Sequence, residues 1–437
     1  MRLVTEPAAS PLRGELTPPG DKSISHRALI FACLAEGQSR ITGLLDSADV
    51  KATANACRQL GMGMREEGSL LVLDGVGAAG LSRPDAPLDM GNSGTAMRLL
   101  AGVLAAQPFE SELFGDSSLN GRPMKRIVAP LTMMGASIET AEGGTPPLKI
   151  AGNPELQGID YQSPVASAQV KSCLLLAGLY AIGHTTVSEP LQSRDHTEKM
   201  LPAFGVELHG SCGVTGGSRL TGTSIHVPAD ISSAAFFMVA AALVPGSDLL
   251  LMNVGLNATR DGVIHVLKAM GADIAVENPR CQGGEEVGDI RVRYAGRLNA
   301  IEIPAELIPS LIDELPVIFA LAAVSRGVTV LRGAAELRVK ESDRLAVMAK
   351  GLTALGVELQ EFPDGIDIEG GLIGRGRVDG AGDHRCAMSF AILGQVASAE
   401  VQIDGAENIN TSFPSFVRDL TGIGGAVSVL PGDTRHG

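Results

Sequence analysis

Six stretches of the chain share one pattern, in which an apolar segment ends on a glycine and alternating apolar and polar residues follow. The copies are CRQLGMGM (57–64), LTMMGASI (131–138), LPAFGVEL (201–208), LKAMGADI (267–274), LTALGVEL (352–359) and LTGIGGAV (420–427). Glycine readily adopts the left-handed conformation that ends many helices, and alternation is typical of a strand. The pattern therefore predicts six helix–glycine–strand copies, with cap glycines Gly61, Gly135, Gly205, Gly271, Gly356 and Gly424.

A second repeated pattern is a very apolar helix followed by a small turn and a short strand. It occurs at residues 25–43, 94–115, 168–189, 232–253, 313–333 and 384–405. A helix that is hydrophobic on most sides is buried, and self-similarity along a chain indicates a repeat architecture. We therefore expect an α/β fold of six units, three per domain, with the apolar helices inside and the sheets outside.

Two proline-containing joints bracket about three of these units. They lie at Pro18-Pro19-Gly20 and at residues 228–230. Prolines and glycines between periodic segments are typical of linkers. The predicted domains are therefore 21–228 and a discontinuous domain formed by 1–20 plus 229–437.

Charged residues gather where the predicted helices begin. Ser, Thr, Asp and Asn there are ordinary N-caps, which is our interpretation of Thr95, Ser232 and Ser233. Cations at a helix start oppose the helix dipole, whereas free N–H groups and cations together bind anions. Eight cations occupy such positions and predict a site for two multiply charged anions: Lys22, Arg27, Arg122, Lys171, Arg194, Lys340, Arg344 and Arg385. Asp313 and Glu341 lie beside them and could act as base and acid.

The composition narrows the classes of function. The formal net charge is −14, and aromatic residues are 3% of the chain, which argues against a nucleic-acid partner. No P-loop, H-E-x-x-H or C-x-x-C motif occurs, so we expect neither a metal nor a nucleotide cofactor. The start of the chain lacks an apolar signal core, and the longest apolar run, 234–244, is too short to span a membrane. We expect a cytoplasmic protein without membrane contact, and a monomer.

Eight strings carry a resemblance to a known family. They are PGDKSISHRALI (19–30), DMGNSGTAMRL (89–99), GDSSLNGRPM (115–124), SAQVKS (167–172), SRDHTEKML (193–201), IDELP (312–316), ELRVKESDRL (336–345) and DHRCAMSF (383–390). In this order they resemble the 5-enolpyruvylshikimate-3-phosphate (EPSP) synthases, in particular the class II bacterial branch. The resemblance implies the enolpyruvyl transferase fold: two domains, each of three βαβαββ units, with the active site in the cleft between them.

The resemblance also implies a cofactor-independent reaction of the shikimate pathway. The 5-hydroxyl of shikimate-3-phosphate attacks C2 of phosphoenolpyruvate while C3 is protonated, and the tetrahedral intermediate then loses phosphate. The implied catalytic residues are Asp313 as base, Glu341 as proton donor and Lys22 at both substrates. Glu341 and Lys340 both remain candidates for the group that protonates C3.

The same resemblance assigns binding roles position by position. The implied shikimate-3-phosphate contacts are Lys22, Ser23, Arg27, Ser167, Ala168, Gln169, Arg194, Asp313 and Lys340. The implied phosphoenolpyruvate contacts are Lys22, Gly94, Arg122, Gln169, Arg344 and Arg385.

Two positions deserve separate mention. Some family members carry a lysine near the position of Thr411, so that phosphate contact is in doubt here. Gly94 is alanine in some glyphosate-insensitive relatives, and glycine therefore predicts sensitivity to glyphosate.

Two other functions fit parts of the sequence. A UDP-N-acetylglucosamine enolpyruvyl transferase would share the architecture, but it predicts an asparagine where Ser23 stands and a cysteine in the loop 115–124. A non-catalytic anion-binding repeat protein could keep the arginines, but it has no use for Asp313 together with Glu341.

Overall fold

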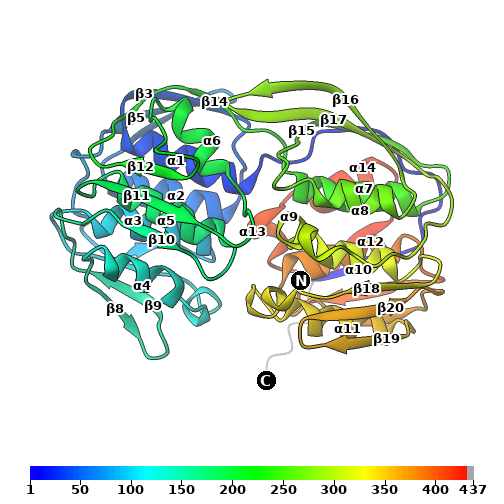
Figure 1. The fold of residues 1–437 in the computed structure, drawn as a ribbon. Coiled ribbons are helices and arrows are strands. Elements are labelled where there is room, and N and C mark those ends of the chain that lie inside the picture. Colours follow the sequence, from blue (N-terminus) through cyan, green and yellow to red (C-terminus); the bar gives the residue numbers. More distant parts are fainter. Residues whose placement is uncertain (431–437) are drawn as a thin grey trace. The chain divides into compact units, whose positions relative to one another are not determined.

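The chain folds into two compact units in the computed structural model, which describes residues 1–430. The second unit comprises Gly20–Pro228 together with Cys281–Glu285. The first unit comprises Met1–Pro19, Ala229–Arg280 and the chain from Glu286 onward. Both units are mixed α/β (Figure 1), which confirms the predicted fold class.

The second unit contains six α-helices and twelve strands within the described residues. Its helices are α1 (Lys22–Leu34), α2 (Ala48–Gln59), α3 (Gly94–Ala105), α4 (Lys125–Met133), α5 (Ala168–Gly178) and α6 (His196–Ala203), with a 3₁₀ turn η1 (Leu119–Gly121). Its strands are β3 (Ala35–Thr42), β4 (Gly63–Glu67), β5 (Leu70–Val76), β6 (Leu88–Asp89), β7 (Ser111–Phe114), β8 (Ile138–Ala141), β9 (Thr145–Ile150), β10 (Asp160–Gln162), β11 (His184–Ser188), β12 (Gly213–Thr215), β13 (Leu220–Thr221) and β14 (Ser224–His226). They form the sheets β13-β3-β5-β4 with β14 on β3, β6-β7-β9-β8, and β10-β11-β12.

The first unit is built from both ends of the chain. Its helices are α7 (Ile231–Leu243), α8 (Gly262–Ala269), α9 (Ile308–Leu311), α10 (Leu315–Ala322), α11 (Arg344–Ala354), α12 (His384–Gly394), α13 (Ile409–Ser412) and α14 (Phe416–Gly422), with 3₁₀ turns η2 (Ala305–Leu307) and η3 (Ala335–Val339). Its strands are β1 (Arg2–Thr5), β2 (Arg13–Leu16), β15 (Asp248–Gly255), β16 (Asp273–Gln282), β17 (Glu285–Arg293), β18 (Val328–Leu331), β19 (Leu359–Phe362), β20 (Gly365–Glu369), β21 (Gly376–Asp379), β22 (Val401–Asp404) and β23 (Val427–Leu430). They form the sheets β21-β22-β1-β23, β16-β17-β15-β2 and β18-β20-β19.

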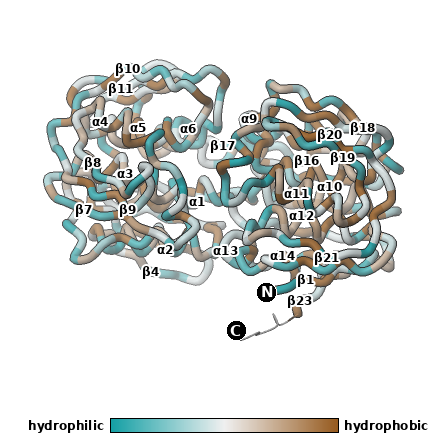
Figure 2. Tube along the Cα trace, turned by 90° about the horizontal axis from the view of Figure 1, so that it is seen from below, coloured by the Kyte–Doolittle hydropathy of each residue, from teal (hydrophilic) through white to brown (hydrophobic). Residues whose placement is uncertain are grey.

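The most apolar helices lie in the cores of the two units. Helices α1, α3 and α5 supply much of one core, and α7, α10 and α12 pack on one another in the other. The hydropathy colouring of Figure 2 shows the apolar character of α5 and of the stretch around α10 and α12. Burial at about 25 cal/mol per Å² of apolar surface makes such helices the main source of stability. The prediction that the apolar helices lie inside is confirmed.

All six repeated glycines adopt the predicted left-handed conformation. Their φ values are 109° at Gly61, 98° at Gly135, 86° at Gly205, 96° at Gly271, 88° at Gly356 and 102° at Gly424. Strands follow closely at five of them: β4, β8, β16, β19 and β23. The prediction of a strand directly after Gly205 is wrong, because the chain first turns through residues 206–212 before β12 begins.

The helix starts follow the predicted positions, although three of the predicted caps are wrong. Ser93 caps α3, so Thr95 lies inside the helix, and Asp230 caps α7 ahead of Ser232 and Ser233. In both helices the residue with extended backbone one position before the helix accepts the free N–H group, as an N-cap requires.

Candidate active site

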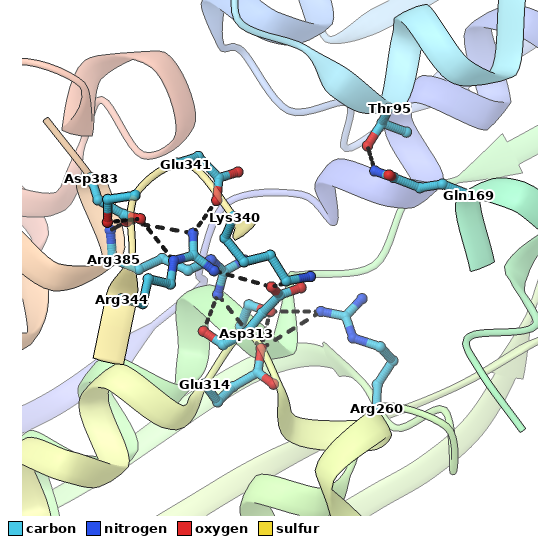
Figure 3. A network of polar contacts seen from close by, with 12 residues as sticks. Thr95, Gln169, Arg260, Asp313, Glu314, Lys340, Glu341, Arg344, Asp383 and Arg385 are labelled. Carbon is cyan, nitrogen blue, oxygen red and sulfur yellow. Dashed lines mark hydrogen bonds and ion pairs between the residues drawn. The ribbon is translucent and has the colours of Figure 1, made fainter. Parts of the chain in front are cut away.

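Asp313 lies just before α10 in the first unit, with two cations beside its carboxylate. The Arg344 Nη1 atom is 3.2 Å from Asp313 Oδ1, and the Lys340 Nζ atom is 3.7 Å from the same oxygen. Figure 3 shows the three side chains converging. One carboxylate oxygen of Asp313 therefore lies between two cations.

Arg344 is the centre of this charged network, although it is almost completely buried. Its Nη2 donates to Glu341 Oε2 at 2.5 Å, and its Nε donates to Asp383 Oδ2 at 2.8 Å. Asp383 is also the N-cap of α12, so the same carboxylate fixes both a helix start and the guanidinium. Burial would lower the pKa of Arg344, but Asp383, Glu341 and Asp313 outweigh it and raise that pKa.

Arg385 approaches Asp313 from the first turn of α12. Its Nη1 donates to the backbone carbonyl of Asp313 at 2.9 Å and lies 3.6 Å from Glu314 Oε1. Glu314 is buried, accepts from Ser232 Oγ, and lies near buried Arg260 (Figure 3). The structure thus brings together the predicted site residues of the first unit: Asp313, Lys340, Glu341, Arg344 and Arg385.

A second group of predicted residues surrounds the start of α3 in the second unit. Arg122 Nη2 donates to Asn92 Oδ1 at 2.6 Å, and Arg122 Nη1 would lie 3.3 Å from a Cβ added to Gly94. Gln169 accepts from Arg98 Nη1 at 2.7 Å and donates to Thr95 Oγ1 at 2.9 Å. Gly94, Arg122 and Gln169 therefore share one neighbourhood, where two guanidinium groups favour an anion.

The start of α1 carries two more of the predicted cations of this unit. Lys22 forms an ion pair with Asp49, and Arg27 donates to the carbonyl of Ser23 at 2.9 Å. Arg27 also donates to Thr197 Oγ1 at 2.8 Å and to Ser172 Oγ at 2.7 Å. Burial lowers the pKa of Arg27 to about 10, so the group is still a cation at neutral pH.

His26 links the starts of α1 and α3. Its Nδ1 lies 2.7 Å from Thr53 Oγ1, and its Nε2 lies 3.3 Å from Oγ of the α3 cap Ser93. Burial, followed by the charges of Lys22 and Arg27, lowers the pKa of His26 well below its usual value. The imidazole is therefore neutral and acts as a hydrogen-bonding link between two helix starts.

Lys171 does not belong with the anion-binding cations, and its assignment to that set was wrong. Its Nζ atom is buried, 3.1 Å from Glu189 Oε2 and 2.8 Å from Glu198 Oε1. Two carboxylates already neutralise the ammonium group. Arg194, the remaining predicted cation, lies just before α6, and its charge contributes to lowering the pKa of Arg27.

Sequence reasoning missed the residues that hold these side chains in place. They are Asp49, Asn92, Arg98, Glu189, Arg260, Glu314 and Asp383. The signal that could have found Asp383 is its place at a helix start, directly before His384 and Arg385. Partners such as Asp49 and Glu189 stand on other elements, and no spacing in the chain connects them to the site.

Three further observations complete the description. The hydroxyl of Thr411 donates to the carbonyl of Asn408 at 2.7 Å, so this position supplies no cation. Within residues 1–430, His, Cys, Asp and Glu side chains form no group of three or more that could hold a metal ion. The helices of the same described range include none with the length and apolarity that crossing a membrane requires.

Comparison with known proteins identifies the family. The sequence model of EPSP synthase (3-phosphoshikimate 1-carboxyvinyltransferase) matches residues 7–420. The 3-phosphoshikimate 1-carboxyvinyltransferase of Xanthomonas campestris pv. campestris (strain B100) is 55% identical over 424 residues, covering 96% of this chain and 97% of the relative. That of Xanthomonas oryzae pv. oryzae (strain PXO99A) is 54% identical over 409 residues, covering 93% of each.

The solved structures agree with the sequence comparison. An EPSP synthase from Acinetobacter baumannii superposes with a TM-score of 0.88 at 47% identity, covering 98% of this chain and 100% of that one. The family model, matched over residues 7–420, covers all the site residues described above. The chain belongs to the EPSP synthase family.

Proposed function

We propose that the chain transfers the enolpyruvyl group of phosphoenolpyruvate to the 5-hydroxyl of shikimate-3-phosphate and releases inorganic phosphate. Its family and its relatives, named 3-phosphoshikimate 1-carboxyvinyltransferases, support this activity. The observation that carries the proposal is the Asp313 carboxylate beside Lys340 and Arg344, with Glu341 on the same guanidinium. An anion-binding protein without catalysis needs the cations but not two acids among them.

The reaction divides into an addition and an elimination. In the addition, Asp313 accepts the proton of the 5-hydroxyl, the oxygen forms a bond to C2 of phosphoenolpyruvate, and an acid protonates C3. In the elimination, the bond between C2 and the phosphate oxygen breaks, phosphate leaves, and C3 loses a proton to restore the double bond. A base in contact with the hydroxyl contributes about 10²–10⁴-fold to such a step.

The ion pair of Arg344 bears on which group protonates C3. With Glu341 Oε2 at 2.5 Å from Arg344 Nη2, the ionised form of Glu341 is favoured. A substrate carboxylate that binds Arg344 would compete with Glu341 for the guanidinium. Losing that partner favours the protonated acid, so we propose that phosphoenolpyruvate itself prepares Glu341 to donate. Lys340, whose Nζ atom lies 3.7 Å from Asp313 Oδ1, is the alternative donor.

Each of the two substrates draws its proposed contacts from both charge clusters. We propose that Ser23, Arg27, Ser167, Ala168, Gln169 and Arg194, with Lys22, Asp313 and Lys340, contact shikimate-3-phosphate. We propose that Lys22, Gly94, Arg122, Gln169, Arg344 and Arg385 contact phosphoenolpyruvate, because guanidinium groups pair with carboxylate and phosphate through two hydrogen bonds. The division into domains 1–20 plus 229–437 and 21–228, both serving one reaction in a cytoplasmic monomer, stays part of this proposal.

The test is phosphate release measured with both substrates and with each alone. We expect release only when shikimate-3-phosphate and phosphoenolpyruvate are present together. Release with UDP-N-acetylglucosamine in place of shikimate-3-phosphate would assign the chain to the other enolpyruvyl transfer reaction. Binding of both anions without release would assign it to a non-catalytic role.

A further inference from the structure

The backbone at the start of α5 is held by a carboxylate from a different element. Ser167 caps α5 with its side chain, and its own backbone N–H donates to Glu189 Oε1 at 2.6 Å. Glu189 follows directly after β11, which packs against α5 (Figure 1). The orientation of the peptide groups from Ser167 to Gln169 therefore depends on where this carboxylate lies.

The same carboxylate also holds the segment that leads into α6. Ser193 donates to Glu189 Oε2 from its backbone N–H at 3.2 Å and from its hydroxyl at 2.7 Å. Ser193 immediately precedes Arg194. One side chain thus connects the two segments of this unit that carry Ser167, Ala168, Gln169 and Arg194.

The buried ammonium group of Lys171 explains why residue 189 is a charged glutamate. The Lys171 and Glu189 side chains are 4% and 6% exposed, with 3.1 Å between Nζ and Oε2. Lys171 Nζ also contacts Glu198 and lies 3.4 Å from the carbonyl of Ser193. Burial would lower the pKa of Lys171, but Glu198 and Glu189 raise it, so the ammonium stays charged. A buried charge needs partners that compensate it, and Lys171 has them in Glu189, Glu198 and the carbonyl of Ser193.

We propose that Glu189, fixed by Lys171, is a positioning residue for shikimate-3-phosphate. It touches no substrate, but it sets the peptide groups of Ser167 and Ser193 and so aligns the residues on either side of them. This inference rests on the proposed function, which places Ser167, Ala168, Gln169 and Arg194 at that substrate. Phosphoenolpyruvate affinity depends less on Glu189, because Gln169 is the one proposed contact of that substrate that lies in a segment held by Glu189.

The test is steady-state kinetics of Glu189→Gln in the full-length protein. The amide keeps the size of the side chain but loses the charge that Lys171 holds. We expect the KM for shikimate-3-phosphate to rise about tenfold, as loss of a charge-assisted hydrogen bond does. The KM for phosphoenolpyruvate and kcat should change less than about threefold.

Glu198→Gln is the matched control, because it removes the other carboxylate on Lys171 and leaves the Ser167 contact intact. We expect its KM for shikimate-3-phosphate to stay within about twofold of wild type. Each single variant leaves Lys171 with one carboxylate partner, so both should lower Tm by a similar amount. A rise in the KM for shikimate-3-phosphate in Glu189→Gln alone therefore separates positioning from loss of stability.

Two outcomes would overturn the inference. They are an unchanged KM for shikimate-3-phosphate in Glu189→Gln and an equal rise of that KM in Glu198→Gln. Wild-type turnover is measured first. Absence of wild-type turnover refutes the proposed function, whereas normal turnover with an unchanged variant KM refutes only the role of Glu189.

Discussion

Asp313 receives two cations at Oδ1 of its carboxylate and a third at its backbone carbonyl. Arg344 and Lys340 both approach Oδ1, and Arg385 uses the backbone carbonyl of the same residue. Changing the carboxylate to an amide therefore removes a base while most of the surrounding cations keep their other partners. This separation of chemistry from binding leads to the first prediction.

In Asp313→Asn we expect turnover to fall by about 10²–10⁴-fold, because the amide cannot accept the hydroxyl proton. Shikimate-3-phosphate binding, measured by calorimetry, should change far less than turnover. Asp273→Asn is the control, since this exposed acid on β16 makes only a 3.8 Å ion pair with Arg293. Near-normal turnover of Asp313→Asn would remove Asp313 from the mechanism.

Gly94 gives the second prediction, which concerns the fit of the smaller substrate. A Cβ at this position would lie 2.7 Å from Arg98 Nη1 and 3.3 Å from Arg122 Nη1. In Gly94→Ala the guanidinium groups must shift, and we expect the KM for phosphoenolpyruvate to rise by about 10–200-fold, the range for one methyl group in a pocket.

Inhibition by glyphosate gives a second measure of how closely a Cβ at position 94 approaches the guanidinium groups of Arg98 and Arg122. We expect micromolar-range inhibition of the wild-type protein and weaker inhibition of Gly94→Ala. Gly371→Ala is the control, because a Cβ there meets nothing within 4 Å. A KM unchanged in Gly94→Ala would show that phosphoenolpyruvate binds elsewhere.

His26 gives a third prediction at the residue scale, a dependence of stability on pH. Its pKa in the folded protein lies below the ordinary value of 6.5 because the ring is buried. Below about pH 6.5 the unfolded chain binds a proton that the folded protein does not, so folding is destabilised as pH falls. The contribution is fully present above about pH 6.5 and is lost by up to about 1.4 kcal/mol per pH unit below it.

Denaturant unfolding between about pH 7.5 and 5.5 checks this slope. His26→Gln should flatten it, whereas His209→Gln, which changes an exposed histidine, should leave it unchanged. The same slope in wild type and His26→Gln would contradict the prediction.

The site shows what the sequence could and could not predict about single residues. Lys22, Asp313 and Arg344 stand at helix starts within recognisable strings, so pattern and resemblance both lead to them. Lys171 stands at an equivalent place and was misassigned, because its neutralising partners Glu189 and Glu198 come from later elements. Charge at a position is visible in the sequence, but the partner that cancels it depends on the tertiary fold.

At the scale of elements, the cap glycines were predictable because their requirement is local. Each one ends a helix with a backbone conformation that costs other residues about 1–2 kcal/mol. The strand after Gly205 was not predictable in the same way. Val206 and Leu208 alternate as a strand would, but the β10-β11-β12 sheet pairs β11 with residues 213–215 instead. Strand pairing depends on the partner as well as on the pattern.

The cap glycines give a fourth prediction, at the element scale. Gly271 has a φ of 96°, and a Cβ added there meets nothing within 4 Å, so only backbone strain opposes a side chain. We expect Gly271→Ala to lower the free energy of unfolding by about 1–2 kcal/mol, measured with denaturant.

Gly422→Ala is the matched control, because Gly422 also has free space but ends α14 without a left-handed φ. There the substitution should be neutral or stabilising by up to about 1 kcal/mol. Equal effects at both positions would mean that backbone conformation is not what selects glycine at the helix ends.

At the scale of the whole molecule, strand pairing explains why the first unit uses both ends of the chain. Leu3 in β1 pairs with Ile403 on one side and Val429 on the other, and β2 pairs with β15. The residues of the hairpin tip, Cys281–Glu285, belong to the second unit, where Glu285 contacts His196 at 2.7 Å. Pro279 and the Gly283-Gly284 pair mark a turn there, but no feature of the sequence assigns the tip to the other unit.

Each of the two units has a hydrophobic core of its own, so a ligand that binds to one unit should stabilise that unit. The last prediction concerns this stabilisation. Shikimate-3-phosphate, bound at the starts of α1 and α5, should stabilise the second unit through mass action alone. At about 100 times its Kd, the gain is about 2.7 kcal/mol. For a unit of this size that corresponds to a rise in Tm of about 5–10 °C in calorimetry.

Glu189→Gln should need a proportionally higher concentration of shikimate-3-phosphate to reach the same rise. Shikimate, which lacks the phosphate, is the control ligand and should give a smaller shift, because Arg27 and Arg194 would have less charge to pair with. A Tm that does not respond to saturating shikimate-3-phosphate would contradict the placement of this substrate at the helix starts of the second unit. A normal response in Glu189→Gln would contradict only the positioning role of that carboxylate.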